Sequence, residues 1–160
     1  MRQIDLLFTE YGESHQNATN KAIHWVCVPL IFFSIVCLIW AVPAGPLQAL
    51  GGASPNPFFN WATLILGLVL VYYLSLSVAL FFGMAIFAGL CLLGAYWLEV
   101  YTPWPLWVVG LIIFFAAWAG QFYGHKIEGK KPSFFKDLQF LLIGPAWLMH
   151  FLYRKMGLRY

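Results

Sequence analysis

Charge is what this sequence most conspicuously lacks. No Asp, Glu, Lys or Arg occurs between residues 22 and 98, and charged residues make up only 9% of the chain, whereas hydrophobic residues make up 62%. An ordinary globular protein carries about 25% charged residues, so this chain has too few to cover a water-facing surface. The composition excludes a soluble fold and predicts a small all-α integral membrane protein, with 1–160 as a single membrane domain.

Basic charge is equally scarce, which argues against nucleic acid as a partner. Nine Lys and Arg residues beside six Asp and Glu residues give a net charge of only +3. Binding to nucleic acid requires basic side chains that neutralise several phosphates at once. We therefore expect membrane lipids, and no nucleic acid, among the partners; the sequence does not indicate an oligomeric state.

Recognised metal and redox motifs are missing as well. The chain contains no HExxH or CxxC motif and none of the HxxxH or HxxHH clusters of membrane desaturases. Its three cysteines lie within apolar stretches and are expected to be small buried side chains rather than redox groups. Any metal site must therefore come from residues that the fold brings together.

Long apolar stretches predict about four transmembrane helices, because a helix needs about 20 apolar residues to cross the hydrocarbon core. These spans are expected at 23–42, 58–80, 81–98 and 104–122. The second and third are contiguous and together are about twice one crossing, so we expect a tight hairpin within 75–83. The segment 138–153 is shorter and contains Gly144 and Pro145, which predicts a C-terminal re-entrant or interfacial segment rather than a fifth crossing.

The positions of Lys and Arg predict the orientation. If the N-terminus is cytoplasmic, four spans place the basic loop 126–137 in the cytoplasm, together with Arg154, Lys155 and Arg159. Every Lys and Arg then lies on one face, as the positive-inside rule requires, whereas a fifth crossing would export the last three. We expect both termini in the cytoplasm, at the bacterial inner membrane or, in a eukaryote, the endoplasmic reticulum.

All four histidines fall at the cytoplasmic face in this topology. They are His15, His24, His125 and His150. His15 and His24 are nine positions apart, two and a half helical turns, so on one continuous helix they would point to opposite faces. The chain must therefore bend between them if they are to meet.

A short amphipathic helix is expected before that bend, at 2–14. Its apolar face consists of Ile4, Leu7, Phe8 and Tyr11. The first span is then expected to begin near Thr19 or Asn20, since turn and cap formers precede the apolar run.

Imidazoles and carboxylates that converge at a polar rim could bind a divalent metal such as iron or zinc. Asn20 and His24, at i and i+4, share a helix face, and His125 and Glu128, at i and i+3, can do the same. A single interfacial histidine more often contacts lipid headgroups, but ionisable groups inside apolar segments are candidates for function. The residues alone leave both interpretations open.

The order of these polar residues resembles a known family. Three motifs carry the resemblance: Tyr11-x3-His15-x4-Asn20-x3-His24-x4-Pro29, Gly124-His125-x2-Glu128-x3-Pro132, and Ile143-Gly144-Pro145. They are similar to the small membrane 2-hydroxy fatty acid dioxygenases of the Mpo type, long filed as a family of unknown function and typified by the fungal enzyme of phytosphingosine breakdown. The resemblance spans almost the whole chain.

This resemblance implies an iron(II)-dependent dioxygenase that carries out alpha-oxidation. A 2-hydroxy fatty acid and dioxygen would give a fatty acid one carbon shorter, with Fe(II) as the cofactor. The resemblance implies iron ligation by His15, His24 and His125, and His150 is a fourth candidate ligand.

Four further residues are candidates for roles around the iron. Asn20 and Glu128 are expected to orient the ligand imidazoles or bound water. Lys21 is expected to pair with the substrate carboxylate, and Tyr11 to donate a hydrogen bond to an iron-bound oxygen. Two alternatives remain: a zinc-dependent membrane lipid hydrolase with the same ligands, and a non-enzymatic lipid-binding membrane scaffold.

Overall fold

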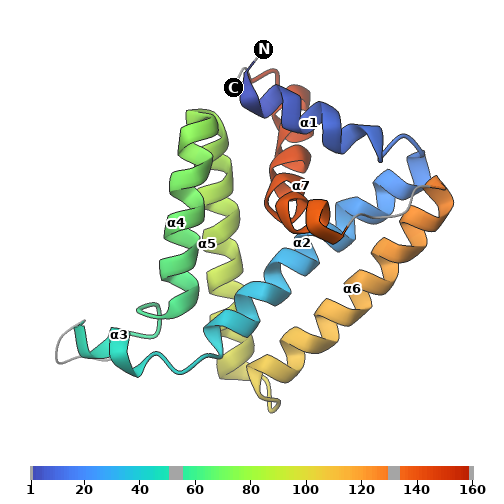
Figure 1. The fold of residues 1–160 in the computed structure, drawn as a ribbon. Helices are drawn as coiled ribbons and strands as arrows, with labels where there is room; N and C mark the ends of the chain where they lie inside the picture. Colours follow the sequence, from blue (N-terminus) through green and yellow to red (C-terminus); the bar gives the residue numbers. More distant parts are fainter. Residues whose placement is uncertain (1, 51–55, 130–133, 159–160) are drawn as a thin grey trace.

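A computed structural model describes residues 2–50, 56–129 and 134–158, with only the backbone described for 134–139. Within these residues the regular structure is entirely helical (Figure 1). The helices are α1 (Gln3–Glu13), α2 (Ala18–Trp40), α3 (Gly45–Leu50), α4 (Trp61–Leu76), α5 (Val78–Tyr101), α6 (Leu106–Glu128) and α7 (Phe134–Lys155). The predicted all-α class is confirmed for the described part of the chain.

Three of these helices, α2, α5 and α6, are long and apolar enough to cross a membrane. This is consistent with the membrane protein that the composition predicts. α4 is apolar but only 16 residues long, shorter than the roughly 20 residues that a crossing usually needs. The predicted total of four transmembrane helices therefore stays a prediction.

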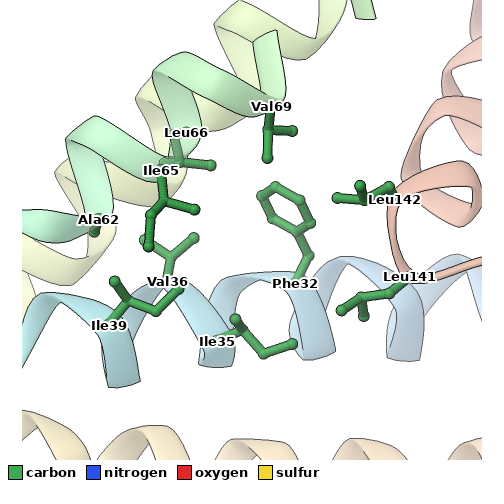
Figure 2. A pocket seen from close by; sticks show the side chains of 10 residues that line it. All are labelled: Phe32, Ile35, Val36, Ile39, Ala62, Ile65, Leu66, Val69, Leu141 and Leu142. Carbon is green, nitrogen blue, oxygen red and sulfur yellow. The ribbon is translucent and has the colours of Figure 1, made fainter. Parts of the chain in front are cut away.

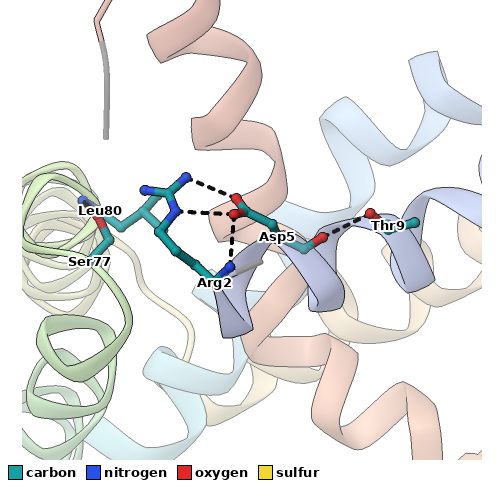
Figure 3. Close-up of polar contacts among 5 residues, drawn as sticks. All are labelled: Arg2, Asp5, Thr9, Ser77 and Leu80. Atoms are coloured by element: carbon teal, nitrogen blue, oxygen red, sulfur yellow. Dashed lines mark hydrogen bonds and ion pairs between the residues drawn. The ribbon is translucent and has the colours of Figure 1, made fainter.

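The predicted hairpin between the second and third apolar stretches is present at Ser77. Its backbone is extended, with φ −168° and ψ 130°, and its hydroxyl accepts a hydrogen bond from the Leu80 amide at 3.5 Å (Figure 3). α4 and α5 consequently lie side by side (Figure 1). Their boundaries differ from 58–80 and 81–98 because this serine cap, rather than a change in apolarity, ends one helix and begins the next.

α1 is the amphipathic helix that the sequence predicts at 2–14. The Arg2 guanidinium forms an ion pair with the Asp5 carboxylate at 2.9 Å (Figure 3), and the hydrogen bond from this guanidinium lowers the pKa of Asp5. The apolar face of α1 packs against α7. Its buried residues are Ile4, Phe8 and Tyr11.

α2 and α6 pack closely along their lengths and run antiparallel. A Cβ at Gly110, near the start of α6, would lie 3.2 Å from the side chain of Leu38, near the end of α2. A Cβ at Gly124, near the end of α6, would collide with Asn20, near the start of α2. Because glycine has no side chain, the two backbones can approach at both levels. The end of α6 is thereby seated against the start of α2.

Gly120 offers a test of this packing. A Cβ at Gly120 would lie 2.6 Å from the Cys27 sulfur, so Gly120→Ala is expected to push α2 and α6 apart and to lower the free energy of unfolding by about 1–3 kcal/mol. Gly89 of α5 is the matched control, because nothing lies within 4 Å of its Cβ position; Gly89→Ala should preserve or raise stability. Denaturant unfolding in detergent micelles measures both, and equal stabilities would contradict the close approach.

The segment 138–153 differs from the prediction. It was expected to be interrupted at Gly144 and Pro145, whereas α7 is one helix that runs through both residues. Gly144 is a packing contact instead: a Cβ there would lie 3.0 Å from Val28 and 3.1 Å from the Tyr11 hydroxyl. The predicted interruption at these two residues is therefore wrong, because the helix continues through them. The re-entrant or interfacial placement of α7 stays a prediction.

α7 is also fixed against the α4–α5 hairpin. The Tyr73 hydroxyl of α4 donates a hydrogen bond to the Leu142 carbonyl at 2.6 Å, and the Tyr153 hydroxyl of α7 donates one to the Ala79 carbonyl at 2.5 Å. Tyr73 is fully buried within a core that α1, α2, α4, α5 and α7 share. These contacts hold the helix on both sides of Pro145, which cannot donate the usual hydrogen bond to the Leu141 carbonyl.

The described basic residues lie in the first or last turn of a helix or directly before one. They are Arg2 before α1, Lys21 in the first turn of α2, Lys126 in the last turn of α6, Lys136 in the first turn of α7, and Arg154 and Lys155 in the last turn of α7. Lys130, Lys131, Pro132 and Arg159 lie outside the described residues. The cytoplasmic location of the basic residues stays a prediction.

Candidate metal centre

Three histidines from distant parts of the sequence meet where α1 joins α2 beside the end of α6. One ring nitrogen from each of His15, His24 and His125 lies within 4.8 Å of the other two. The ring centroids are 4.2 Å apart for His15 and His24, 5.1 Å for His24 and His125, and 5.7 Å for His15 and His125. His15 is 2% exposed and His24 is 1% exposed. The geometry is that of a candidate metal site shielded by protein.

The bend between α1 and α2 brings His15 over His24, as the spacing predicts. Asn17 caps α2, since its side-chain oxygen accepts hydrogen bonds from the Thr19 amide at 2.8 Å and the Asn20 amide at 3.3 Å. α2 begins at Ala18, immediately before the predicted start. The reversal of the chain before this cap places two histidines from one sequence motif in contact.

Backbone carbonyls orient two of the three imidazoles. His15 Nδ1 lies 2.6 Å from the Tyr11 carbonyl oxygen, and His24 Nδ1 lies 2.9 Å from the Asn20 carbonyl oxygen. When Nδ1 donates to a carbonyl, the unprotonated Nε2 is the ligand atom. Among the described residues, His15 Nε2 is buried and has no hydrogen-bond partner. A metal-binding imidazole likewise has an unprotonated nitrogen whose lone pair is not used in a hydrogen bond.

Burial lowers the pKa of His15, and the positive charges of a protonated His125 and of Lys21 act in the same direction. The hydrogen bond to the Tyr11 carbonyl and the charge of Glu128 oppose this effect. A lowered pKa keeps the imidazole neutral, and neutral imidazole is the form that binds a metal.

Glu128 ties the end of α6 to the turn that carries His15. Its carboxylate accepts hydrogen bonds from the Gln16 amide at 2.8 Å, the Asn17 amide at 3.0 Å and the Asn20 side-chain amide at 2.9 Å. The same Asn20 nitrogen donates to the Ser14 carbonyl at 3.2 Å. Glu128 and the Asn20 side chain thus lie where they can position the ligands through the turn, while the Asn20 carbonyl contacts His24 directly.

Aromatic rings cover His15. Tyr11 stacks on His15 with centroids 4.2 Å apart and an angle of 14° between the planes, and Trp147 of α7 lies 5.4 Å from His15. Both aromatic side chains are 5% exposed. Sequence reasoning missed Trp147, because its contact with His15 joins two segments that lie far apart in the sequence. The predicted hydrogen bond from Tyr11 to an iron-bound oxygen stays a prediction.

His150 is not brought together with the other histidines. Its ring packs 5.2 Å from Phe8 and 5.3 Å from Phe151, and it does not belong to the group of mutually close ring nitrogens. Lys21 follows Asn20 in the first turn of α2 and is half-buried. Its pairing with a substrate carboxylate stays a prediction.

An apolar groove lies deeper along α2. Side chains from three helices line one apolar space (Figure 2), whose volume is about 270 Å³. They are Phe32, Ile35, Val36 and Ile39 of α2, Ala62, Ile65, Leu66 and Val69 of α4, and Leu141 and Leu142 of α7. Its volume is slightly below the roughly 300–1,000 Å³ typical of ligand sites. Phe32 follows His24 by about 12 Å along α2, so an apolar surface lies within reach of the histidines.

The family description 2-hydroxy-palmitic acid dioxygenase Mpo1-like matches residues 1–156. Neither a curated protein nor a solved structure matches the chain. The matched residues include the three clustered histidines and Glu128, in agreement with the resemblance carried by the polar motifs. Since the match covers nearly the entire sequence, the chain belongs to the Mpo1-like family.

Proposed function

We propose that this chain is an iron(II)-dependent dioxygenase that converts a 2-hydroxy fatty acid into a fatty acid one carbon shorter. The observation that carries the proposal is the group formed by the buried His15 and His24 and the half-buried His125 in a chain whose family is described by such an activity. The helices apolar enough to cross a membrane suit a substrate with a long alkyl tail.

The three histidines fit a divalent transition metal. One ring nitrogen from each lies within 4.8 Å of the other two. The buried His15 Nε2 lacks a partner among the described residues, an arrangement that costs free energy unless something binds there. Three protein ligands leave positions for other molecules. Iron(II), when bound, would supply the redox chemistry by which dioxygen reacts with an organic acid.

The surrounding residues would hold the three imidazoles in position and exclude water from the site. The carbonyls of Tyr11 and Asn20 fix the rings of His15 and His24, and Glu128 fixes the turn. Trp147 and the Tyr11 ring exclude water from one side of His15.

The polar end of the substrate would lie at the rim of the helix bundle, and its tail would lie in an apolar environment. Lys21, in the first turn of α2, supplies a positive charge for the carboxylate. The lipid and the apolar groove offer surface for the alkyl chain, where each buried methylene contributes about 0.8 kcal/mol. A substrate with a polar end and an apolar tail would explain why polar residues gather at one end of apolar helices.

The proposed reaction balances with dioxygen as the sole oxidant. The bond between the carboxyl carbon and C2 breaks, and C2 becomes the carboxyl carbon of the shorter acid. With the original carboxyl carbon released as carbon dioxide, one substrate and one dioxygen give the shorter acid, carbon dioxide and one water. The substrate supplies all four electrons that dioxygen accepts, so no separate reductant is needed.

Metal exchange separates this function from its alternatives. Protein stripped of metal and reloaded with iron(II) is expected to consume 2-hydroxypalmitate only when dioxygen is present, whereas zinc-loaded protein should be inactive. Hydrolysis of an ester-linked or amide-linked lipid by the zinc form without dioxygen would support a lipid hydrolase. Absence of turnover with either metal would support a lipid-binding scaffold.

A further inference from the structure

A glutamine is buried in the apolar part of α6. Gln121 is 7% exposed, and its Oε1 has no hydrogen-bond partner within the parts of the chain that the structure describes. It lies between two other buried residues of the α6 face, Ala117 and Gly124. Buried polar groups in proteins are almost always hydrogen-bonded, and polar residues within membrane helices are generally functional. The unpaired oxygen can therefore accept a hydrogen bond from a group that the protein itself does not provide.

The position of Gln121 places it next to the histidines. It precedes His125 by one helical turn, and residues four apart on a helix face the same way with Cβ atoms about 5–6 Å apart. Two glycines of α6 lie against residues of α2: Gly120 contacts Cys27, and Gly124 contacts Asn20. Gln121 thus lies opposite the part of α2 that carries His24, one turn deeper into the helix bundle than His125.

The chemistry of the unpaired atom selects the ligand group. An amide oxygen only accepts hydrogen bonds, so its partner must supply a donor. An ionised carboxylate has no donor, and an alkyl chain has none either. The hydroxyl group of a 2-hydroxy acid does, and it is attached to the carbon beside the carboxylate.

We infer that Gln121 accepts a hydrogen bond from the 2-hydroxyl group of the substrate and makes the site selective for 2-hydroxy acids over unsubstituted fatty acids. This inference rests on the proposed function, because it places the polar end of a 2-hydroxy acid at the histidines. A site built to bind a substrate hydroxyl discriminates strongly against the analogue that lacks it, because the polar group of the protein is then left unpaired.

Binding preference tests the inference separately from turnover. Dissociation constants for 2-hydroxypalmitate and palmitate are measured in detergent micelles, by tryptophan fluorescence, with metal-free and zinc-loaded protein. The wild type is expected to prefer the hydroxy acid by at least about tenfold, and Gln121→Leu should bring the ratio to near one. Because leucine removes an unpaired buried group, the melting temperature should stay the same or rise, and iron retention should be unchanged.

Thr63→Val is the matched control. Thr63 Oγ1 of α4 is also buried without a partner among the described residues, but it lies two residues after the start of α4, outside the histidine group. This variant should keep the wild-type preference. If Gln121→Leu does not fold, Gln121→Asn withdraws the amide by one methylene and should also weaken the preference.

Two results would overturn the inference: an unchanged preference in a folded Gln121 variant, or a loss of iron and thermal stability that accompanies the lost preference. The second would make Gln121 a structural residue. A wild-type protein that prefers the hydroxy acid but never converts it would refute the proposed function and leave the role of Gln121 intact.

Discussion

Replacement of any one of His15, His24 and His125 by alanine is expected to abolish both iron retention and turnover of 2-hydroxypalmitate. The three ring nitrogens lie within 4.8 Å of one another, so each substitution removes one protein ligand and leaves an apolar gap. Loss of a residue that only supports a ligand costs about 10–100-fold in metal affinity, and loss of the ligand itself should cost more than 100-fold. Metal analysis of protein purified without oxygen measures the effect.

His150→Ala is the control for these substitutions. His150 packs against Phe8 and Phe151, so its loss should leave the iron content near that of the wild type. If His24→Ala kept its iron, or if His150→Ala lost as much as His24→Ala, the assignment of the three ligands would be wrong.

Replacement of Glu128 by alanine is expected to weaken iron binding by about 10–100-fold while the helices remain folded. The carboxylate accepts hydrogen bonds from the amides of Gln16 and Asn17 and from the Asn20 side chain. Without it, the turn that carries His15 loses its attachment to α6. The affinity for iron(II), measured by competition with a chelator, should fall, and the helical circular dichroism signal should not.

Glu99 is the matched carboxylate. It accepts a hydrogen bond from the Trp40 indole at 2.7 Å, at the opposite end of α2 from the histidines. Glu99→Ala should therefore leave the affinity for iron unchanged. Equal losses from Glu99→Ala and Glu128→Ala would indicate a general effect on the fold rather than a specific effect on the turn.

The convergence of three histidines was predictable because it follows from spacing and topology. Nine positions between His15 and His24 require a bend if the two are to meet, and Asn17 provides the cap that starts α2 there. The long stretch without charge confines the polar residues to the ends of the helices. Arguments from spacing and topology predict the depth of a residue in the membrane. For residues on one helix, they also predict which helix face each side chain lies on.

Spacing and topology do not determine which residues at the same depth in the membrane contact one another. His150 was expected at the same face as His15, yet α7 directs it toward Phe8. Likewise, Trp147 covers His15 because α7 crosses α2 at Gly144, where the absence of a side chain permits a close approach to Val28. This is a three-dimensional contact between distant helices, and no local pattern encodes it.

The predicted interruption at Pro145 was also wrong, because α7 continues through this residue. Pro145 removes one hydrogen bond from the helix, which favours an interruption when the segment is considered alone. In the structure the segment is packed among α1, α2, α4 and α5, and its Leu142 carbonyl accepts a hydrogen bond from Tyr73. These tertiary contacts hold the helix around Pro145, so it continues although one of its hydrogen bonds is missing.

The most direct test of the proposed iron-dependent alpha-oxidation follows the carboxyl carbon of the substrate. Iron(II)-loaded protein is supplied with dioxygen and 2-hydroxypalmitate labelled with ¹³C at the carboxyl carbon, and the products are identified by mass spectrometry. We expect an unlabelled acid one carbon shorter and labelled carbon dioxide, in equal amounts and matched by the dioxygen consumed, with neither formed by His24→Ala protein. Label retained in the acid product, or the same products from the His24→Ala variant, would contradict the proposed function.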